Sequence, residues 1–256
     1  MSGFSVSSTL VRRAVASPNF GERRGGAPVD MLVLHYTGCP SAESALLWMC
    51  SPDSQVSAHY LVDEDGEIIQ LVDEAARAWH AGAAFWAGET DINSRSVGIE
   101  IQNPGHLECP PPPYPNVQME AVIALCRDIM ARHGISPLRV VGHSDVAPAR
   151  KTDPGEHFPW HRLAEEGLAF MVEPAPLCIR GAWLGPGDAG EEVARLQDGL
   201  ARIGYGVGKT GVFDELTEAV VRAFQRRFRP QKVDGVADAS TMATLERVLA
   251  ALDNVA

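Results

Sequence analysis

The pattern of hydrophobic and polar positions changes its period several times along the first two thirds of the chain. Short apolar or alternating runs predict strands at residues 31–36, 58–72, 96–102 and 139–143. Within the second run, Asp65 and Gly66 form a strong hairpin signal, so we expect two strands joined by a turn. Apolar residues at helical spacing over 121–134 predict a helix that ends at a glycine. Strands mixed with helices indicate the α/β class, with a mixed central β-sheet flanked by helices.

The last third of the chain shows only the helical period. Apolar residues three and four positions apart predict three helices, which begin near Val193, Asp214 and Asp238. The second and third begin in a repeat, because residues 211–217 recur as residues 235–241 with an Asp at the expected N-cap and a Thr three positions later. The pattern favours a small all-α three-helix domain with a structural or binding role, since it holds no histidine and no obvious acid/base pair.

A segment rich in proline and glycine separates the two patterns. Proline and glycine at this density disfavour helix and strand, so residues 174–186 are predicted to be a linker. The chain then divides into a larger domain over 1–173 and a helical domain over 187–256. Within the larger domain, residues 109–115 contain five prolines and are expected to form an extended surface loop.

Composition and charge narrow the classes of partner. The chain has 256 residues, of which 45% are hydrophobic and 21% are charged, which is ordinary for a globular protein. Its formal net charge of -11 argues against nucleic acid and anionic membrane as electrostatic partners. The sequence has no apolar run of the length that a membrane span requires. Most of the negative charge belongs to the larger domain.

The cysteines and the first residues bear on the compartment. The five cysteines are widely spaced and form no Cys-x-x-Cys pair, which favours free thiols in a reducing compartment. The stretch from Met1 to Arg13 lacks a cationic segment followed by an apolar core, so it does not look like a secretory signal. We therefore expect the cytoplasm. The alternative is the periplasm or outer membrane, if a signal has been removed.

Polar residues stand at the ends of predicted strands, where rigid scaffolds display functional groups. His35 follows one apolar strand run, His143 follows another, and Asp153 lies ten residues later in a turn-forming context. In the alternating strand over 96–102, Glu100 points to the face opposite the apolar residues. A carboxylate there is costly unless that face is wet or the charge is paired.

These residue types fit metal chemistry. Two imidazoles and a carboxylate would give a catalytic zinc ion three ligands and leave a fourth position for water, whose pKa zinc lowers to about 7. A nearby carboxylate could take the proton of that water, and a lysine could stabilise the oxyanion. The spacing alone leaves open that His35 and His143 are hydrogen-bonded core residues, because no His-Glu-x-x-His motif supports the zinc interpretation.

Five segments in order carry a resemblance to a known family. The chain resembles the zinc N-acetylmuramoyl-L-alanine amidases, of the branch that includes the bacterial cell-wall recycling amidase, through residues 34–38, 56–66, 78–82, 94–102 and 141–155. The resemblance covers roughly residues 16–165. The repeated glycine, aspartate and threonine of the C-terminal part resemble those of the peptidoglycan-binding module often joined to such enzymes.

The resemblance implies roles for individual residues. It places the zinc ligands on His35, His143 and Asp153, the catalytic glutamate on Glu100 and the catalytic lysine on Lys151. Asp153 in the third ligand position is typical of the recycling branch, since phage and animal relatives have cysteine there. The implied reaction is hydrolysis of the amide between the lactyl group of N-acetylmuramic acid, in its 1,6-anhydro form, and L-alanine of the stem peptide. The partners would be anhydromuropeptides or peptidoglycan.

Three other functions remain open at this point. The chain could be an envelope amidase that acts on intact peptidoglycan, a peptidoglycan-binding protein with a vestigial zinc site, or a zinc peptidase that cuts within the stem peptide. Intact Glu100 and Lys151 argue against the vestigial site. The sequence predicts no oligomeric state.

The remaining histidines and two cysteines have weaker signals. His59 is expected to be structural, while His80 is equally compatible with a pocket role and a structural one. We expect the other histidines and the cysteines near His35 to lie outside the chemistry: His157 and His161 in a packing loop, His106 and His133 at the surface, Cys39 and Cys50 as bystanders.

Overall fold

The computed structural model describes residues 6–26 and 28–254, and these form two compact units. The first unit contains residues 6–26, 28–83, 91–143 and 153–170, and the second contains residues 84–90, 144–152 and 171–254. Each unit is described by itself below. The first five residues, on which part of the signal-sequence expectation depends, lie outside the described residues.

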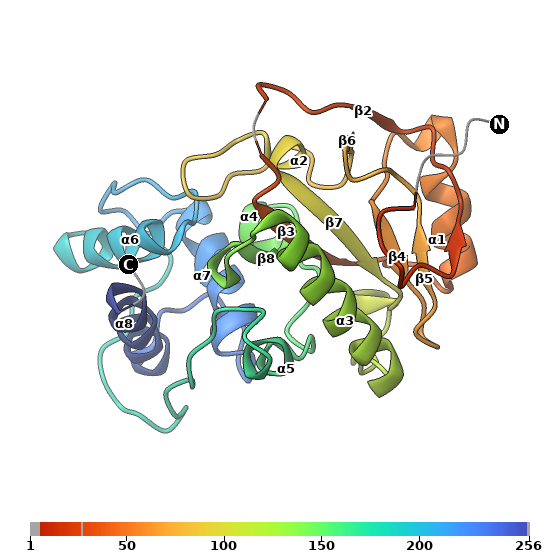
Figure 1. Cartoon of the computed structure of the whole chain (residues 1–256). Coiled ribbons are helices and arrows are strands. Elements are labelled where there is room, and N and C mark those ends of the chain that lie inside the picture. Colours follow the sequence, from red (N-terminus) through yellow and green to blue (C-terminus); the bar gives the residue numbers. More distant parts are fainter. Residues whose placement is uncertain (1–5, 27, 255–256) are drawn as a thin grey trace. The chain divides into compact units, whose positions relative to one another are not determined.

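A six-stranded sheet, counted over the described residues, is the centre of the first unit (Figure 1). Its strands lie in the order β1-β5-β4-β7-β3-β8, with these bounds: β1 Arg13–Ala14, β3 Met31–Tyr36, β4 Tyr60–Val62, β5 Ile68–Gln70, β7 Ser96–Ile101 and β8 Val140–Gly142. All neighbours are parallel except β4 and β5. Strands β2 (Phe20–Glu22) and β6 (Ala76–Ala78) pair separately as an antiparallel ribbon. The predicted α/β class with a mixed central sheet flanked by helices is confirmed, and the structure adds that the sheet is mostly parallel.

The central strands are apolar because both faces of the sheet are covered. Residues 31–34 of β3 have no exposed surface, and the apolar residues of β7 are equally buried. Helix α1 (Ala42–Met49) packs its buried face on residues of β4 and β5, in one apolar cluster. Helix α3 (Asn116–His133) contacts β4, and the side-chain amide of Gln118 donates to the backbone carbonyls of Val62 and Gln102.

Local signals in the sequence are confirmed at the elements that frame the sheet. The turn at Asp65 and Gly66 joins antiparallel β4 and β5, and Gly66 has the positive φ of 86° that such turns require. Helix α3 ends at Gly134 in the left-handed conformation, although it begins five residues before the predicted start. Residues 109–115 contain no helix or strand, as expected for a loop, but residues 109 and 110 form a bend and Tyr114 is buried. The shorter helices of the unit are η1 Pro52–Ser54, α2 Ile92–Arg95, η2 Gly105–Leu107, η3 Pro137–Arg139 and α5 Trp160–Glu165.

The second unit contains the three predicted helices, α6 (Glu191–Ile203), α7 (Glu215–Phe228) and α8 (Ala239–Asp253). The repeat in the sequence is a repeated cap. Asp214 accepts the backbone N–H of Thr217 at 2.8 Å, and Asp238 accepts that of Thr241 at 2.9 Å. Each cap has an aspartate with a pKa below its ordinary value; hydrogen bonding to Thr217 is the main cause at Asp214.

Two segments of the larger sequence domain belong to this second unit. Residues 84–90 and 144–152 group with the three helices, so the unit is not one continuous stretch beyond the linker. Helix α4 (His143–Val146) begins in the first unit and continues into the second. Asp145 is the buried anchor of the second segment: Tyr205 donates to its Oδ1 at 2.8 Å, and Arg227 donates to its Oδ2 at 2.9 Å.

Two general features bear on the expected class of protein. Over the described ranges, every helix is too short or too polar to cross a membrane. The five cysteines are free thiols, of which Cys126 is buried and Cys109 and Cys178 are exposed.

Candidate metal centre

Three parallel strands end together and bring the predicted residues to one edge of the sheet. His35 of β3 is the register partner of Glu100 of β7, so their side chains project to the same face. On the other side of β3, Leu34 pairs with Gly142, the last residue of β8, and His143 follows directly. In open parallel sheets, ligands bind at the carboxyl ends of the strands, and these residues lie at that edge.

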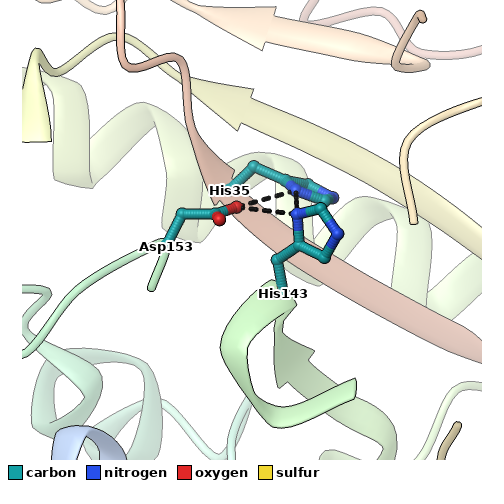
Figure 2. A group of neighbouring side chains, drawn as sticks. All are labelled: His35, His143 and Asp153. Atoms are coloured by element: carbon teal, nitrogen blue, oxygen red, sulfur yellow. Dashed lines mark hydrogen bonds and ion pairs between the residues drawn. The ribbon is translucent and has the colours of Figure 1, made fainter. Parts of the chain in front are cut away.

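His35, His143 and Asp153 converge on one point (Figure 2). The Nδ1 atoms of the two imidazoles are 2.9 Å apart, and each lies 3.0 Å from Oδ2 of Asp153. All three residues are buried.

The donor set fits a zinc ion. The three candidate ligand atoms, two imidazole nitrogens and a carboxylate oxygen, lie within 4.8 Å of one another. Zinc in catalytic sites takes three such protein ligands. The three residues predicted from the sequence therefore form a group that can hold a metal ion.

The Nε2 atoms of both imidazoles, on the side of the ring away from Asp153, also have partners. Nε2 of His35 lies 3.1 Å from Nδ1 of His80, and Nε2 of His143 lies 3.2 Å from the backbone carbonyl of Ala81. An imidazole that donates from Nε2 to such a carbonyl has its Nδ1 lone pair available for a metal. The outer contacts thus agree with binding through Nδ1.

The two predicted catalytic residues, Glu100 and Lys151, belong to different compact units. Glu100 is half-buried on the same face as His35. Burial raises the pKa of the Cys39 thiol, and the charge of Glu100 raises that pKa further. Lys151 is half-buried two positions before Asp153, and its backbone N–H donates to the carbonyl of Ala147 at 3.0 Å. Because Lys151 belongs to the second unit, its role stays a prediction.

The other buried histidines of the first unit are neutral. Burial, and after it the charge of Arg23, lowers the pKa of His59 to about 3. Burial also lowers the pKa of His80 well below its ordinary value, with the neighbouring His35 as the next cause. His59 accepts the backbone N–H of Gly98 at Nδ1 and lies immediately before β4 rather than within a strand.

The remaining histidines differ in exposure and in partners. His133 is half-buried, and its Nε2 pairs with the buried carboxylate of Glu74 at 2.6 Å. His157 stacks on Tyr114 with ring centroids 5.1 Å apart, while His106 and His161 are exposed.

Sequence reasoning left one part of the centre undecided and missed another. For His80 the sequence left a pocket role and a structural role open, and the structure places its Nδ1 3.1 Å from Nε2 of His35. Ser96 and Asn93, which hold the loop that carries His80, were not singled out. The only signal was weak: Ser96 is a polar residue at the start of a mostly apolar strand.

Two family models match the chain. The model described as N-acetylmuramoyl-L-alanine amidase matches residues 25–156, which is just over half of the chain. The model described as a peptidoglycan binding domain matches residues 189–245. The first match contains His35, Glu100 and His143, and the second spans the repeated caps of α7 and α8.

Named relatives extend these matches. The N-acetylmuramoyl-L-alanine amidase AmiD of Escherichia coli strain K12 is 38% identical over 232 residues, which cover 86% of this chain and 82% of AmiD. The 1,6-anhydro-N-acetylmuramyl-L-alanine amidase AmpD of Enterobacter cloacae is 32% identical over 168 residues, covering 59% of this chain and 87% of AmpD.

A solved structure shares the fold along almost the whole chain. It is the complex of Escherichia coli AmiD with anhydro-N-acetylmuramic acid-L-Ala-D-gamma-Glu-L-Lys, and it aligns with a TM-score of 0.74 at 35% identity. The alignment covers 91% of this chain and 98% of AmiD. Sequence, fold and the converging strand-end residues agree, and the chain belongs to the N-acetylmuramoyl-L-alanine amidase family.

Proposed function

We propose that the chain is a zinc hydrolase that cleaves the amide bond between the lactyl group of N-acetylmuramic acid and L-alanine of the stem peptide. The observation that carries the proposal is the buried convergence of His35, His143 and Asp153 at the carboxyl ends of parallel strands. Family membership supplies the class of bond.

The buried group holds the metal, and its neighbours handle protons. When bound, zinc supplies Lewis acidity, which polarises a carbonyl and lowers the pKa of water to about 7. Glu100 shares a face with His35 and is assigned the general base that takes a proton from the attacking water. Glu100 later returns this proton to the amine of L-alanine as the amide bond breaks.

Lys151 is assigned to the developing negative charge. Its ammonium donates a hydrogen bond to the carbonyl oxygen as that oxygen becomes an oxyanion. Support for this role comes from its place in the chain, between two candidate ligands and two residues from Asp153. A Lys151→Met variant would lower kcat and leave zinc binding intact.

The proposed substrate is a soluble muropeptide that carries the 1,6-anhydro sugar. Two similarities support this choice: AmpD is named for the anhydro sugar, and the aligned AmiD structure contains an anhydromuramyl tripeptide. Intact peptidoglycan is the second candidate. The peptidoglycan binding domain match over residues 189–245 favours it.

The test is hydrolysis of anhydro-N-acetylmuramyl-L-Ala-D-γ-Glu-L-Lys by the full-length protein, with products identified by mass spectrometry. Free tripeptide that begins with L-alanine, lost on chelation and restored by zinc, would support the proposal. Isolated peptidoglycan assayed in parallel ranks the two substrates. A sugar product that retains alanine would instead identify a peptidase. No cleavage of either substrate by the zinc-loaded protein would indicate a binding protein and overturn the proposal.

We also propose that the natural gene product works in the cytoplasm, where anhydromuropeptides would be recycled. The free state of all five cysteines supports a reducing compartment. Cell fractionation of the natural gene product tests this directly. Recovery in the periplasm or in the outer membrane would contradict it.

A further inference from the structure

We propose that His80 is a positioning residue of the metal centre: with Ser96, it holds His35 in the tautomer that presents Nδ1 to the metal. This inference rests on the proposed zinc site at His35, His143 and Asp153. It assigns a function to a histidine whose role the sequence left undecided.

The direction of the hydrogen bonds behind His35 is set by a carbonyl group. The hydroxyl of Ser96 lies 2.7 Å from the backbone carbonyl of Ile92, which can only accept, so the hydroxyl donates to it. Nε2 of His80 lies 3.1 Å from the same hydroxyl oxygen and therefore donates its proton to Ser96.

The same polarity continues to the metal ligand. A neutral imidazole that donates from Nε2 has an acceptor lone pair at Nδ1. Nδ1 of His80 lies 3.1 Å from Nε2 of His35, so the proton in this contact belongs to His35. His35 then has no proton on Nδ1, the atom that faces His143 and Asp153. Hydrogen bonds of this kind fix the tautomer of metal-binding histidines.

The second histidine ligand is oriented by the next residue of the same loop. Nε2 of His143 lies 3.2 Å from the carbonyl of Ala81, which also requires the proton on Nε2. The side-chain oxygen of Asn93 accepts the backbone N–H groups of both His80 and Ala81, at 3.2 and 2.8 Å. The loop that contains His80 and Ala81 is held by Asn93, and it therefore provides the hydrogen-bond partners of Nε2 in both His35 and His143.

Packing fixes the ring of His80 in place. His80 is buried against Gly98 of β7, where an added Cβ would come within 2.5 Å of the ring. The ring of His35 meets that of His80 edge to face, with centroids 5.1 Å apart. Because the ring has little room to move, its two nitrogens keep their partners. The donor and acceptor directions of the hydrogen bonds from Ser96 to His35 are therefore preserved.

The first experiment measures zinc affinity by competition with a chelator of known affinity. We expect His80→Leu to weaken zinc binding by about 10- to 100-fold, the usual cost of losing an outer hydrogen bond to a ligand. His80→Asn places an amide oxygen near the former Nδ1 and should restore most of the affinity. Ser96→Ala removes only the group that orients His80, so its loss should be smaller than that of His80→Leu.

The matched control is His59→Leu. His59 is also fully buried, and its ring centroid is 5.8 Å from that of His80, but its hydrogen-bond partners are Arg23, Ala76 and Gly98 rather than a metal ligand. A purely structural role of His80 would lower thermal stability in both Leu variants and leave both zinc affinities unchanged. That outcome would overturn the inference.

A second measurement avoids variants that fold poorly. Long-range proton–nitrogen correlation spectra of the zinc-free, ¹⁵N-histidine-labelled protein report which ring nitrogen of His35 carries the proton. We expect Nε2, and Nδ1 would overturn the inference. The proposed zinc site has its own test: Asp153→Ala must lose zinc. If Asp153→Ala loses zinc as expected while His80→Leu binds zinc with wild-type affinity, the role of His80 is rejected and the zinc site is retained.

Discussion

Two buried aspartates, eight positions apart in the sequence, have opposite surroundings. Asp145 in the second unit accepts hydrogen bonds from the guanidinium of Arg227 and the hydroxyl of Tyr205. Asp153 in the first unit faces Nδ1 of His35 and Nδ1 of His143 instead. With both imidazole protons held on Nε2, neither ring donates to Asp153.

The difference lies in where the compensating charge comes from. A buried carboxylate is stable only when its charge is paired and hydrogen-bonded. Asp145 obtains this from a permanent cation within its own unit. Asp153 shares its surroundings with two nitrogen lone pairs, so the group attracts a cation from solution. One arrangement stabilises the fold, and the other creates a binding site.

The largest expected effect comes from removing the acid of the metal group. Asp153→Ala should lose zinc under dialysis and lower kcat/KM by more than about 10⁴-fold, the upper limit for losing a proton-transfer group alone. Metal analysis and muropeptide hydrolysis check this. An Asp153→Ala protein that retains zinc and activity would contradict the assignment of Asp153 to metal binding.

The next effect separates a carboxylate that binds metal from one that moves protons. Glu100→Gln keeps the shape of the side chain and removes its basicity, so kcat should fall by about 10²–10⁴-fold. Zinc content should equal that of the wild type. Loss of zinc from Glu100→Gln would move Glu100 into the metal group and contradict its assigned role.

The third effect concerns the other aspartate. Arg227→Met leaves Asp145 buried without its cation, which should lower the free energy of unfolding by about 3–5 kcal/mol. Urea unfolding followed by circular dichroism measures the change. The double variant Asp145→Leu with Arg227→Met should recover much of the loss, because it removes both charges. A single variant as stable as the wild type would show that the ion pair contributes little.

The smallest effect is a pH dependence in the first unit. Burial lowers the pKa of His59 to about 3, against about 6.5 in the unfolded chain. As pH falls below 6.5, the unfolded chain binds a proton that the folded protein excludes, so stability is lost down to pH 3. The slope is at most about 1.4 kcal/mol per pH unit. Urea unfolding at pH 7 and pH 5 should show a flatter dependence in His59→Leu; an identical dependence would contradict the burial argument.

The sequence predicted elements whose signals are local. The repeated aspartate caps, the hairpin at Gly66 and the helix ending at Gly134 each depend on a few neighbouring residues. The sequence also placed His35 and His143 at the ends of strands. Their convergence follows from parallel pairing, which brings the ends of β3, β7 and β8 together.

The rest depends on contacts between distant parts of the chain. The role of His80 needs a loop, a strand and the carbonyl of Ile92 at once, and no spacing in the sequence encodes that combination. Gln197 and Gln225 show the same limit: their amides brace Thr217 and Thr241 of the two caps from within the second unit, although neither glutamine belongs to the recognised repeat.

The grouping of residues 144–152 with the C-terminal helices has a practical consequence for anyone who shortens this protein. A truncation in the proline-rich segment would retain His35, His143 and Asp153 and discard Arg227 and Tyr205. Asp145 would then be stranded in the stretch that connects two candidate ligands. The predicted linker is therefore not the boundary between the two compact units. A minimal catalytic fragment would need a redesign of Asp145 together with its new terminus.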